Sequence, residues 1–350
     1  MNYSKFLICC FIASLSFGCK PTETVAVEKN ADSENTVFSD YTIAFGSCDN
    51  QKLENKLWKP ILEHNPDVWI WGGDNVYADT DNMDLLRKNY RTQSQTEGYM
   101  TLKASAKIFG TWDDHDYGLN DGGEEFSAKS ESQIEMLDFL EVDENDIRRK
   151  RAGVYHAELI NLPKGTLNII VLDTRYFRSG LTEAKGSKKR YQPNTYGEGT
   201  VLGTAQWDWL SKELTTSKAD FNIIVSSIQF LSSEHGFETW GNFPHEVDKL
   251  KSLIVESNAK GVILLSGDRH ISEFSKIEIE GLDYPLIDFT SSGLTHAYRG
   301  FSGEPNPYRV EKVVSVESFG LLKFDFDSKT VSMEMRGENN VLQQKILQKY

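Results

Sequence analysis

Short turns that follow apolar runs carry the side chains best suited to bind metal ions. Each apolar run is typical of a buried strand. The side chains that follow these runs are Cys48, Asp74, Asp113, Asp114, His115, Asp268 and His270. In an open α/β sheet, the carboxyl ends of the strands form the edge at which ligands bind. A thiol, several carboxylates and imidazoles gathered at such an edge would make a metal site.

The elements that must position these side chains can be read from the apolar pattern. Strands are expected at 41–45, 68–71, 108–112, 154–160, 167–172, 222–226, 262–266, 285–289, 321–326 and 331–335. Helical spacing of apolar residues predicts helices over 51–64, 82–100, 204–214 and 245–257. The polar helix at 82–100 is a candidate to fold over the site. Strands that alternate with helices predict an α/β fold.

The 350-residue chain carries a formal charge of −14, from 38 basic and 52 acidic residues. A protein this acidic is a poor candidate for tight nucleic-acid binding through its overall field, so no nucleic-acid partner is expected. Bound metal ions would still create a local cationic site able to hold a phosphate. The acidity itself is also explained by solubility alone.

The N-terminus is typical of an export signal. An apolar stretch of about ten residues follows Lys5, which is too short for a membrane span but suits a signal-peptide core. Gly18-Cys19 resembles a bacterial lipobox, although Ser16 stands where Leu is usual. We expect residues 1–19 to be a lipoprotein signal peptide, with Cys19 lipidated. A plain secretory signal cut nearby is the alternative.

Residues 20–38 are polar and are expected to form a flexible tether, which leaves 39–350 as the folded domain. Cys48 is the single cysteine of that domain, so it has no partner for an internal disulfide. A buried and inert thiol is the usual explanation for a lone cysteine. Its position beside the suspected metal site favours a role as a ligand.

A set of short motifs recurs in order between about residues 41 and 300. They are Phe45–Cys48, Gly73–Asp79, Trp112–Asp116, Leu172–Arg178, Ser266–His270 and Ser291–His296. Each motif alone is weak, but the ordered set resembles the PhoD-like alkaline phosphatases of the metallo-dependent phosphatase superfamily. The resemblance implies two mixed β-sheets packed as a sandwich and flanked by helices. It also implies that the protein is a phosphoric ester hydrolase.

Two metal ions are implied by the same resemblance. Asp74 is the candidate to bridge them, since a carboxylate offers two oxygens. Cys48 and Tyr77 would favour a trivalent ion, because neither side chain ionises readily without one; the resemblance implies Fe³⁺ there, with His270 as a further ligand. Asp74, Asp114 and Asp268 would form the second, oxygen-rich site. The resemblance implies Ca²⁺, although other divalent ions suit oxygen ligands, and Asp113 is an alternative to Asp114.

The remaining site residues are assigned roles around the substrate. His115 would protonate the leaving oxygen, and Asp116 would orient its ring. Arg175 would hold a phosphate oxygen, or else form a salt bridge with Asp173 or Asp79. Asn75 would donate to the substrate, or else simply occupy a turn. The segment 222–230 departs from the wider superfamily because it contains no His, and Cys48 replaces the usual first Asp-x-His.

The expected reaction is hydrolysis of a small phosphoester, mono- or diester, by a metal-activated hydroxide. The alternative is a surface lipoprotein that binds a phosphorylated ligand without turnover. In either case the protein would be exported and held at the bacterial cell envelope, on the periplasmic side or the cell surface, through the lipid on Cys19.

Overall fold

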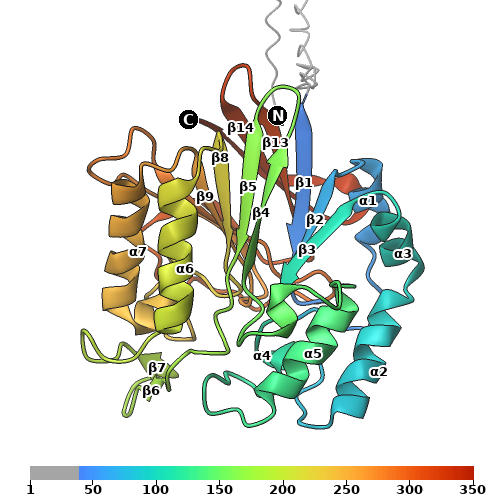
Figure 1. Cartoon of the computed structure of the whole chain (residues 1–350), viewed down its shortest axis with the longest axis vertical. Coiled ribbons are helices and arrows are strands. Elements are labelled where there is room, and N and C mark those ends of the chain that lie inside the picture. Colours follow the sequence, from blue (N-terminus) through green and yellow to red (C-terminus); the bar gives the residue numbers. More distant parts are fainter. Residues whose placement is uncertain (1–38) are drawn as a thin grey trace, which may run out of the picture. The chain divides into compact units, whose positions relative to one another are not determined.

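The computed structural model describes residues 39–350. The expected signal peptide, the lipid anchor on Cys19 and the tether therefore lie outside the described residues. Two large mixed sheets form the centre of the fold, and helices lie on either side of them (Figure 1). This arrangement confirms the expected α/β sandwich. Within residues 39–350, no helix has the length and apolar character that a membrane span requires.

The first sheet has the strand order β15-β14-β13-β1-β2-β3. Its strands are β1 (Tyr41–Gly46), β2 (Val68–Gly72), β3 (Lys107–Thr111), β13 (Phe319–Asp325), β14 (Thr330–Arg336) and β15 (Leu342–Lys349). Strands β1, β2 and β3 run parallel, whereas β13, β14 and β15 continue the sheet as an antiparallel meander. The parallel part therefore presents three carboxyl ends at one edge.

The second sheet has the strand order β12-β10-β11-β9-β8-β5-β4. Its strands are β4 (His156–Asn161), β5 (Thr166–Val171), β8 (Phe221–Val225), β9 (Val262–Ser266), β10 (Ser272–Ile277), β11 (Leu286–Thr290) and β12 (Arg309–Val314). Strands β5, β8, β9 and β11 are parallel to one another. A small hairpin of β6 (Thr182–Glu183) and β7 (Tyr191–Gln192) lies in the long loop that follows β5.

The central strands are apolar on both faces because both faces are covered. In β2, Val68 and Ile70 pack into the core between the two sheets, while Trp69 and Trp71 point to the helices outside. This explains why β2 is a continuous apolar run and not an alternating one. Facing it across the core are residues of the second sheet such as Ile223.

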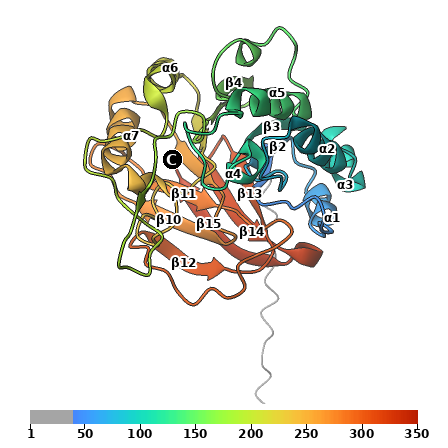
Figure 2. The ribbon, with the colours of Figure 1, turned by 90° about the horizontal axis from the view of Figure 1, so that it is seen from below.

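The helices flank the sheet pair, as the view from below also shows (Figure 2). They are α1 (Trp58–Glu63), α2 (Met83–Ser94), α3 (Glu97–Lys103), α4 (Asp114–Tyr117), α5 (Lys129–Phe139), α6 (Gly203–Thr216) and α7 (Pro244–Ser257). Side chains from α1, α2, α3 and α5 share a core with the outer face of the first sheet. Helices α6 and α7 do the same for the second sheet.

Two helix predictions are wrong in extent. The helix expected over 51–64 begins at Trp58, because the Asn55 side chain accepts from the Leu57 N–H at 2.9 Å and donates to Asp49 at 2.9 Å. Such side-chain bonds compete with helix formation. The helix expected over 82–100 is two helices, α2 and α3. Neither contributes to the lining of the cavity above the metal-ligand residues.

Candidate metal centre

The carboxyl ends of the parallel strands of both sheets meet at one edge. Backbone approach there is so close that glycine is required. A Cβ on Gly73, whose φ is +101°, would lie 2.6 Å from the Asp113 Cβ. A Cβ on Gly267 would lie 2.5 Å from the Ser47 Oγ, across the gap between the sheets. These glycines let the turns after β1, β2, β3 and β9 converge.

One group of candidate ligands contains the thiol. The Cys48 Sγ lies 3.4 Å from the Asp74 Oδ2, and the Tyr77 Oη lies 3.3 Å from the same oxygen. The Tyr77 Oη is also 3.0 Å from the His270 Nε2. We call Cys48, Asp74, Tyr77 and His270 the thiol cluster. The residues predicted from the sequence for the first metal are therefore brought together.

A second group contains oxygen ligands alone. One carboxylate oxygen from each of Asp113, Asp114 and Asp268 lies within 4.8 Å of the others, and Asp74 forms a similar group with Asp114 and His115. The Asp113 Oδ2 is buried without a hydrogen-bond partner among the described residues. We call Asp74, Asp113, Asp114 and Asp268 the carboxylate cluster. Asp113 thus joins Asp114 in this cluster and does not replace it.

Backbone conformations at the two clusters are unusual for side chains with a Cβ. Cys48, Asp74, Asp268 and His270 have φ values of 60°, 51°, 68° and 53°. Left-handed conformations cost about 1–2 kcal/mol for a residue other than glycine. Strain of this kind persists where surrounding contacts impose it, and it gathers at functional sites.

The acidic side chains of the two clusters are buried without enough cations from the chain itself, so their electrostatics suit bound metal ions. Burial raises the pKa of the Cys48 thiol to about 12 and that of Asp268 to about 7. Burial and the neighbouring Cys48 and Asp114 raise the pKa of Asp74 well above its usual range. Asp114 is the exception: burial raises its pKa, but Arg175, His115 and the Asp121 N–H outweigh burial and lower it. Metal ions would favour the ionised form of all these ligands.

His115 is held by a different carboxylate from the one predicted. Its Nδ1 lies 2.7 Å from the Asp79 Oδ1, so Asp79, and not Asp116, orients the ring. The ring also stacks on Tyr77, with centroids 4.3 Å apart. Burial lowers the pKa of His115, but Asp79 and Asp114 outweigh burial and raise it to about 9. Asp79 belongs to the Gly73–Asp79 motif, but its distance of 36 residues from His115 gives no indication that the two side chains are in contact.

Asp116 and Asn75 form a buried structural unit, which fits the alternative for Asn75, a turn residue, and gives Asp116 partners other than the His115 ring. The Asp116 Oδ2 accepts from the Asn75 Nδ2 at 2.7 Å, and its Oδ1 accepts from the Asp113 N–H at 2.7 Å. The Asn75 amide also donates to the Thr111 carbonyl. Both side chains are fully buried, and their hydrogen bonds fix the turn after β3.

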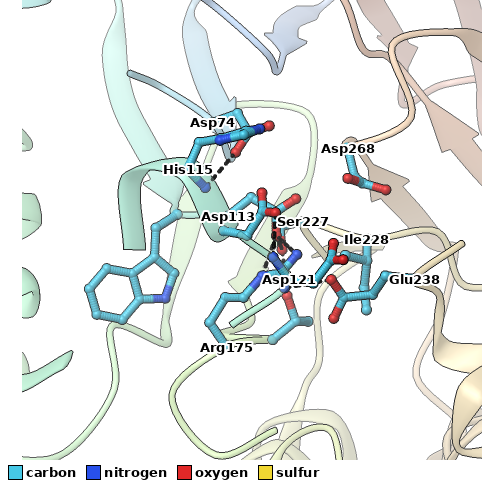
Figure 3. A network of polar contacts seen from close by, with 12 residues as sticks. Asp74, Asp113, His115, Asp121, Arg175, Ser227, Ile228, Glu238 and Asp268 are labelled. Atoms are coloured by element: carbon cyan, nitrogen blue, oxygen red, sulfur yellow. Dashed lines mark hydrogen bonds and ion pairs between the residues drawn. The ribbon is translucent and has the colours of Figure 1, made fainter. Parts of the chain in front are cut away.

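Arg175 is also fully buried. Its guanidinium lies between Asp113 and Glu238, with Nε 2.5 Å from the Asp113 Oδ1 and Nη1 2.5 Å from the Glu238 Oε2 (Figure 3). Glu238 is also paired with Arg178 at 2.8 Å. The alternative of a structural salt bridge is therefore right in kind, but its partners are Asp113 and Glu238. Ser227 lies in the segment 222–230, which contains no His, and it donates to the Asp113 Oδ1 at 2.8 Å.

An open cavity of about 460 Å³ lies above the two clusters. Its floor includes Asp74, Asp114, His115, Asp268 and His270. Apart from Arg269, which belongs to the Ser266–His270 motif, its walls come from loops without a motif. The wall residues include Asn120, Asp121, Arg190, Phe237, Glu238, Arg269, Ala297 and Tyr298. The sequence therefore predicted most of the floor, whereas the walls depend on how distant loops pack together.

Comparisons with known proteins agree with this geometry. A model of the family described as PhoD-like phosphatase matches residues 43–335. Alkaline phosphatase D of Bacillus subtilis (strain 168) is 24% identical over 274 residues, which cover 69% of this chain and 45% of that protein. The chain thus spans about half the length of this curated relative.

Solved structures show the same fold. A structure of PhoD has a TM-score of 0.69 at 16% identity and covers 88% of this chain and 68% of its own. A dimetal phosphatase from Danio rerio has a TM-score of 0.54 at 13% identity and covers 89% of this chain and 100% of its own. The extent of the family match, from β1 to β14, shows that the chain belongs to the PhoD-like phosphatase family.

Proposed function

We propose that this protein hydrolyses phosphoesters with the help of two metal ions. The observation that carries this proposal is that the thiol cluster and the carboxylate cluster share Asp74 on the floor of an open cavity. His115 lies on the same floor, beside Asp74: its backbone N–H donates to the Asp74 Oδ1 at 3.2 Å. A carboxylate shared by two metal sites, with a proton donor beside it, suits two-metal hydrolysis of a phosphoester.

The donor atoms suggest which ions would bind. A thiol, a phenol and an imidazole around Asp74 suit ferric iron, and the oxygen-only set of the carboxylate cluster suits calcium or another divalent ion. The orphaned Asp113 Oδ2 supports a cation in the carboxylate cluster. When bound, the ions would supply Lewis acidity that activates water and neutralises charge on the phosphoryl group.

His115 is the proposed general acid. The Asp79 carboxylate accepts from the His115 Nδ1, which fixes the proton on that nitrogen and leaves Nε2 for the leaving oxygen. Burial lowers the pKa of His115, but Asp79 and Asp114 raise it, which favours the protonated ring. The ring would hand its Nε2 proton to the alcohol oxygen as the bond from that oxygen to phosphorus breaks.

Export and lipid anchoring form part of the proposal. The apolar stretch before Gly18-Cys19 supports a lipoprotein signal, with Cys19 carrying the anchor. The domain would then act at the cell envelope on small phosphoesters that reach it there. Mass spectrometry of the membrane fraction would detect a lipidated Cys19, and an unmodified soluble protein would contradict it.

The experiment that tests the function measures metal content and turnover together. Iron and calcium are quantified in the purified protein, and hydrolysis of p-nitrophenyl phosphate and bis-p-nitrophenyl phosphate is followed in parallel. We expect bound metal and turnover, with iron lost from Cys48→Ser while calcium remains. Protein that takes up both metals but hydrolyses neither ester would instead be a binding protein without turnover.

A second variant tests the acid. Asp79→Asn removes the carboxylate that orients His115, so kcat should fall about 100-fold while iron and calcium contents stay unchanged. Asp81→Asn, a nearby exposed acid, serves as the control. An unchanged kcat in Asp79→Asn would rule out this role for the pair.

A further inference from the structure

We call the two exposed aromatic residues that line the cavity above the metal centre, Phe237 and Tyr298, its aromatic wall. Phe237 and Tyr298 are 40% and 45% exposed. Within residues 39–350, they are the only exposed large apolar side chains that line this cavity. Single exposed aromatic residues are common on protein surfaces, but two that line one polar cavity are a feature of that cavity.

Arg269 extends this wall towards the metal ligands. Its guanidinium carbon lies 4.2 Å from the centre of the Phe237 ring. Arg269 stands in the sequence between Asp268 and His270, one residue from each cluster. Phe237 and Arg269 therefore form a cation–π pair beside the place where a phosphoryl group would react.

The wall is held in place by backbone hydrogen bonds. The Tyr298 N–H donates to the His270 carbonyl at 2.7 Å, and the Phe237 N–H donates to the His235 Nδ1 at 3.1 Å. The carbonyl of Gly236 accepts from the N–H groups of both Arg190 and Tyr191 at 2.9 Å. A preformed wall loses little conformational freedom when a ligand binds, which favours binding.

The charges on the wall are already paired. The Arg269 Nη2 lies 3.1 Å from each oxygen of Glu304, and an Arg190 nitrogen lies 2.7 Å from the Asp121 Oδ2. Neither guanidinium offers uncompensated charge to a second phosphate. What the wall offers instead is the exposed parts of the Phe237 and Tyr298 rings, which can recognise flat rings by stacking.

We propose that the cavity selects phosphoesters whose alcohol carries a planar ring system, such as a nucleobase, and that Phe237, Arg269 and Tyr298 form the subsite for that ring. The proposal rests on the proposed function and adds the substrate class. A volume of about 460 Å³ lies in the range of pockets that enclose ligands of this size. Water replaces the alcohol oxygen on phosphorus, so adenosine 5′-monophosphate would yield adenosine and inorganic phosphate.

The test compares two esters with the same leaving oxygen. Adenosine 5′-monophosphate and methyl ribofuranoside 5-phosphate differ only in the base, so any difference in kcat/KM reports on the ring. The protein supplied with iron and calcium should prefer the nucleotide by about ten-fold or more. Phe237→Ala and Tyr298→Ala should each bring the ratio towards one. Tyr196→Ala, which removes a 65%-exposed aromatic residue outside the cavity, should keep it.

The outcomes separate the subsite from the reaction. Equal kcat/KM for the two esters, or a preference that survives both alanine variants, overturns the subsite while hydrolysis stands. If neither ester is hydrolysed, the proposed function fails, and calorimetric binding of the same two compounds decides the subsite. Tighter binding of the nucleotide that is lost in Phe237→Ala supports the subsite, and equal binding overturns it.

Discussion

Buried carboxylates occur in two very different settings in this protein. Glu334, in β14, is 2% exposed and has cations on several sides: Arg336 Nε at 2.6 Å, with Lys323 and Lys345 Nζ at 3.4 Å each. Burial raises its pKa, but these cations outweigh burial and lower the pKa to about 2. At the edge of the two sheets, cations do not outweigh burial. The pKa values of Asp74, Asp113 and Asp268 are therefore raised.

The difference lies in how each setting compensates its charge. Glu334 is neutralised by its own chain, so it stabilises the fold without help. The carboxylates at the sheet edge share Arg175 with Glu238, and the Asp113 Oδ2 has no hydrogen-bond partner among the described residues. Carboxylates that are buried without enough cations are costly unless metal ions bind them. The comparison therefore separates a structural acid from acids arranged for a cofactor.

The largest effect is expected from Asp74→Asn, which removes the carboxylate shared by both clusters. The rate of hydrolysis should fall by more than about 1,000-fold. This exceeds the roughly 10–100-fold loss typical for a residue that contacts a metal ligand but not the metal. The control is Asp327→Asn. Asp327 is exposed and paired with Lys164, and it lies in a separate acidic group with Asp40 and Asp325. Retained hydrolysis in Asp74→Asn would remove the basis for the shared site.

Arg175→Met should have the next largest effect. It leaves Asp113 and Glu238 buried without their shared cation, so the free energy of unfolding should fall by about 3–5 kcal/mol. Urea denaturation of the protein measures this change. If stability is unchanged and only KM rises, Arg175 acts on the substrate as the sequence first suggested, and the buried ion pair is not what matters.

Metal removal should destabilise the protein to a smaller degree. An ion present at 100 times its dissociation constant stabilises the folded state by about 2.7 kcal/mol, so a chelator should lower Tm and added metal should restore it. Asp74→Asn protein should show no such response. A Tm that ignores both chelator and metal would place the acids at the sheet edge in the same class as Glu334.

The smallest effect concerns Glu334 and runs through pH. Its folded-state pKa, about 2, lies below its ordinary value of 4.5. The contribution of ionised Glu334 to the free energy of unfolding is therefore complete above pH 4.5 and is lost as pH falls from 4.5 towards 2. In Glu334→Gln, urea denaturation should show about 2 kcal/mol less stability at pH 7 and a smaller loss on acidification. Parallel curves for the two proteins would contradict this assignment.

The local sequence predicts which side chains follow the strand ends, but it does not predict their contact partners from distant parts of the chain. Cys48, Asp74, Asp114, Asp268 and His270 each follow an apolar run, so an edge of ligands was predictable before any contact was known. Their neighbours were not predictable in this way. The partner of His115 is 36 residues away and the two partners of Arg175 are 62 and 63 residues away, so only the packed loops bring them together.

The same limit explains why the contacts of Asn75 and Asp116 differ from those expected. Asn75 and Asp116 stand beside ligands in the sequence, and adjacency suggested roles at the substrate. In the fold they face each other under the turn after β3, fully buried. Phe237 and Tyr298 lie in loops without a motif, yet they line the cavity. Which side of a turn a residue faces is decided by tertiary packing and not by its position beside a ligand.

The most direct test is anomalous X-ray diffraction at the iron absorption edge, from crystals of the protein supplied with iron and calcium. We predict an iron peak bounded by Cys48, Asp74, Tyr77 and His270. A second, non-iron metal should lie among Asp74, Asp113, Asp114 and Asp268. Ordered crystals without any metal against the Asp74 carboxylate would contradict the claim that these buried acids are arranged for cations.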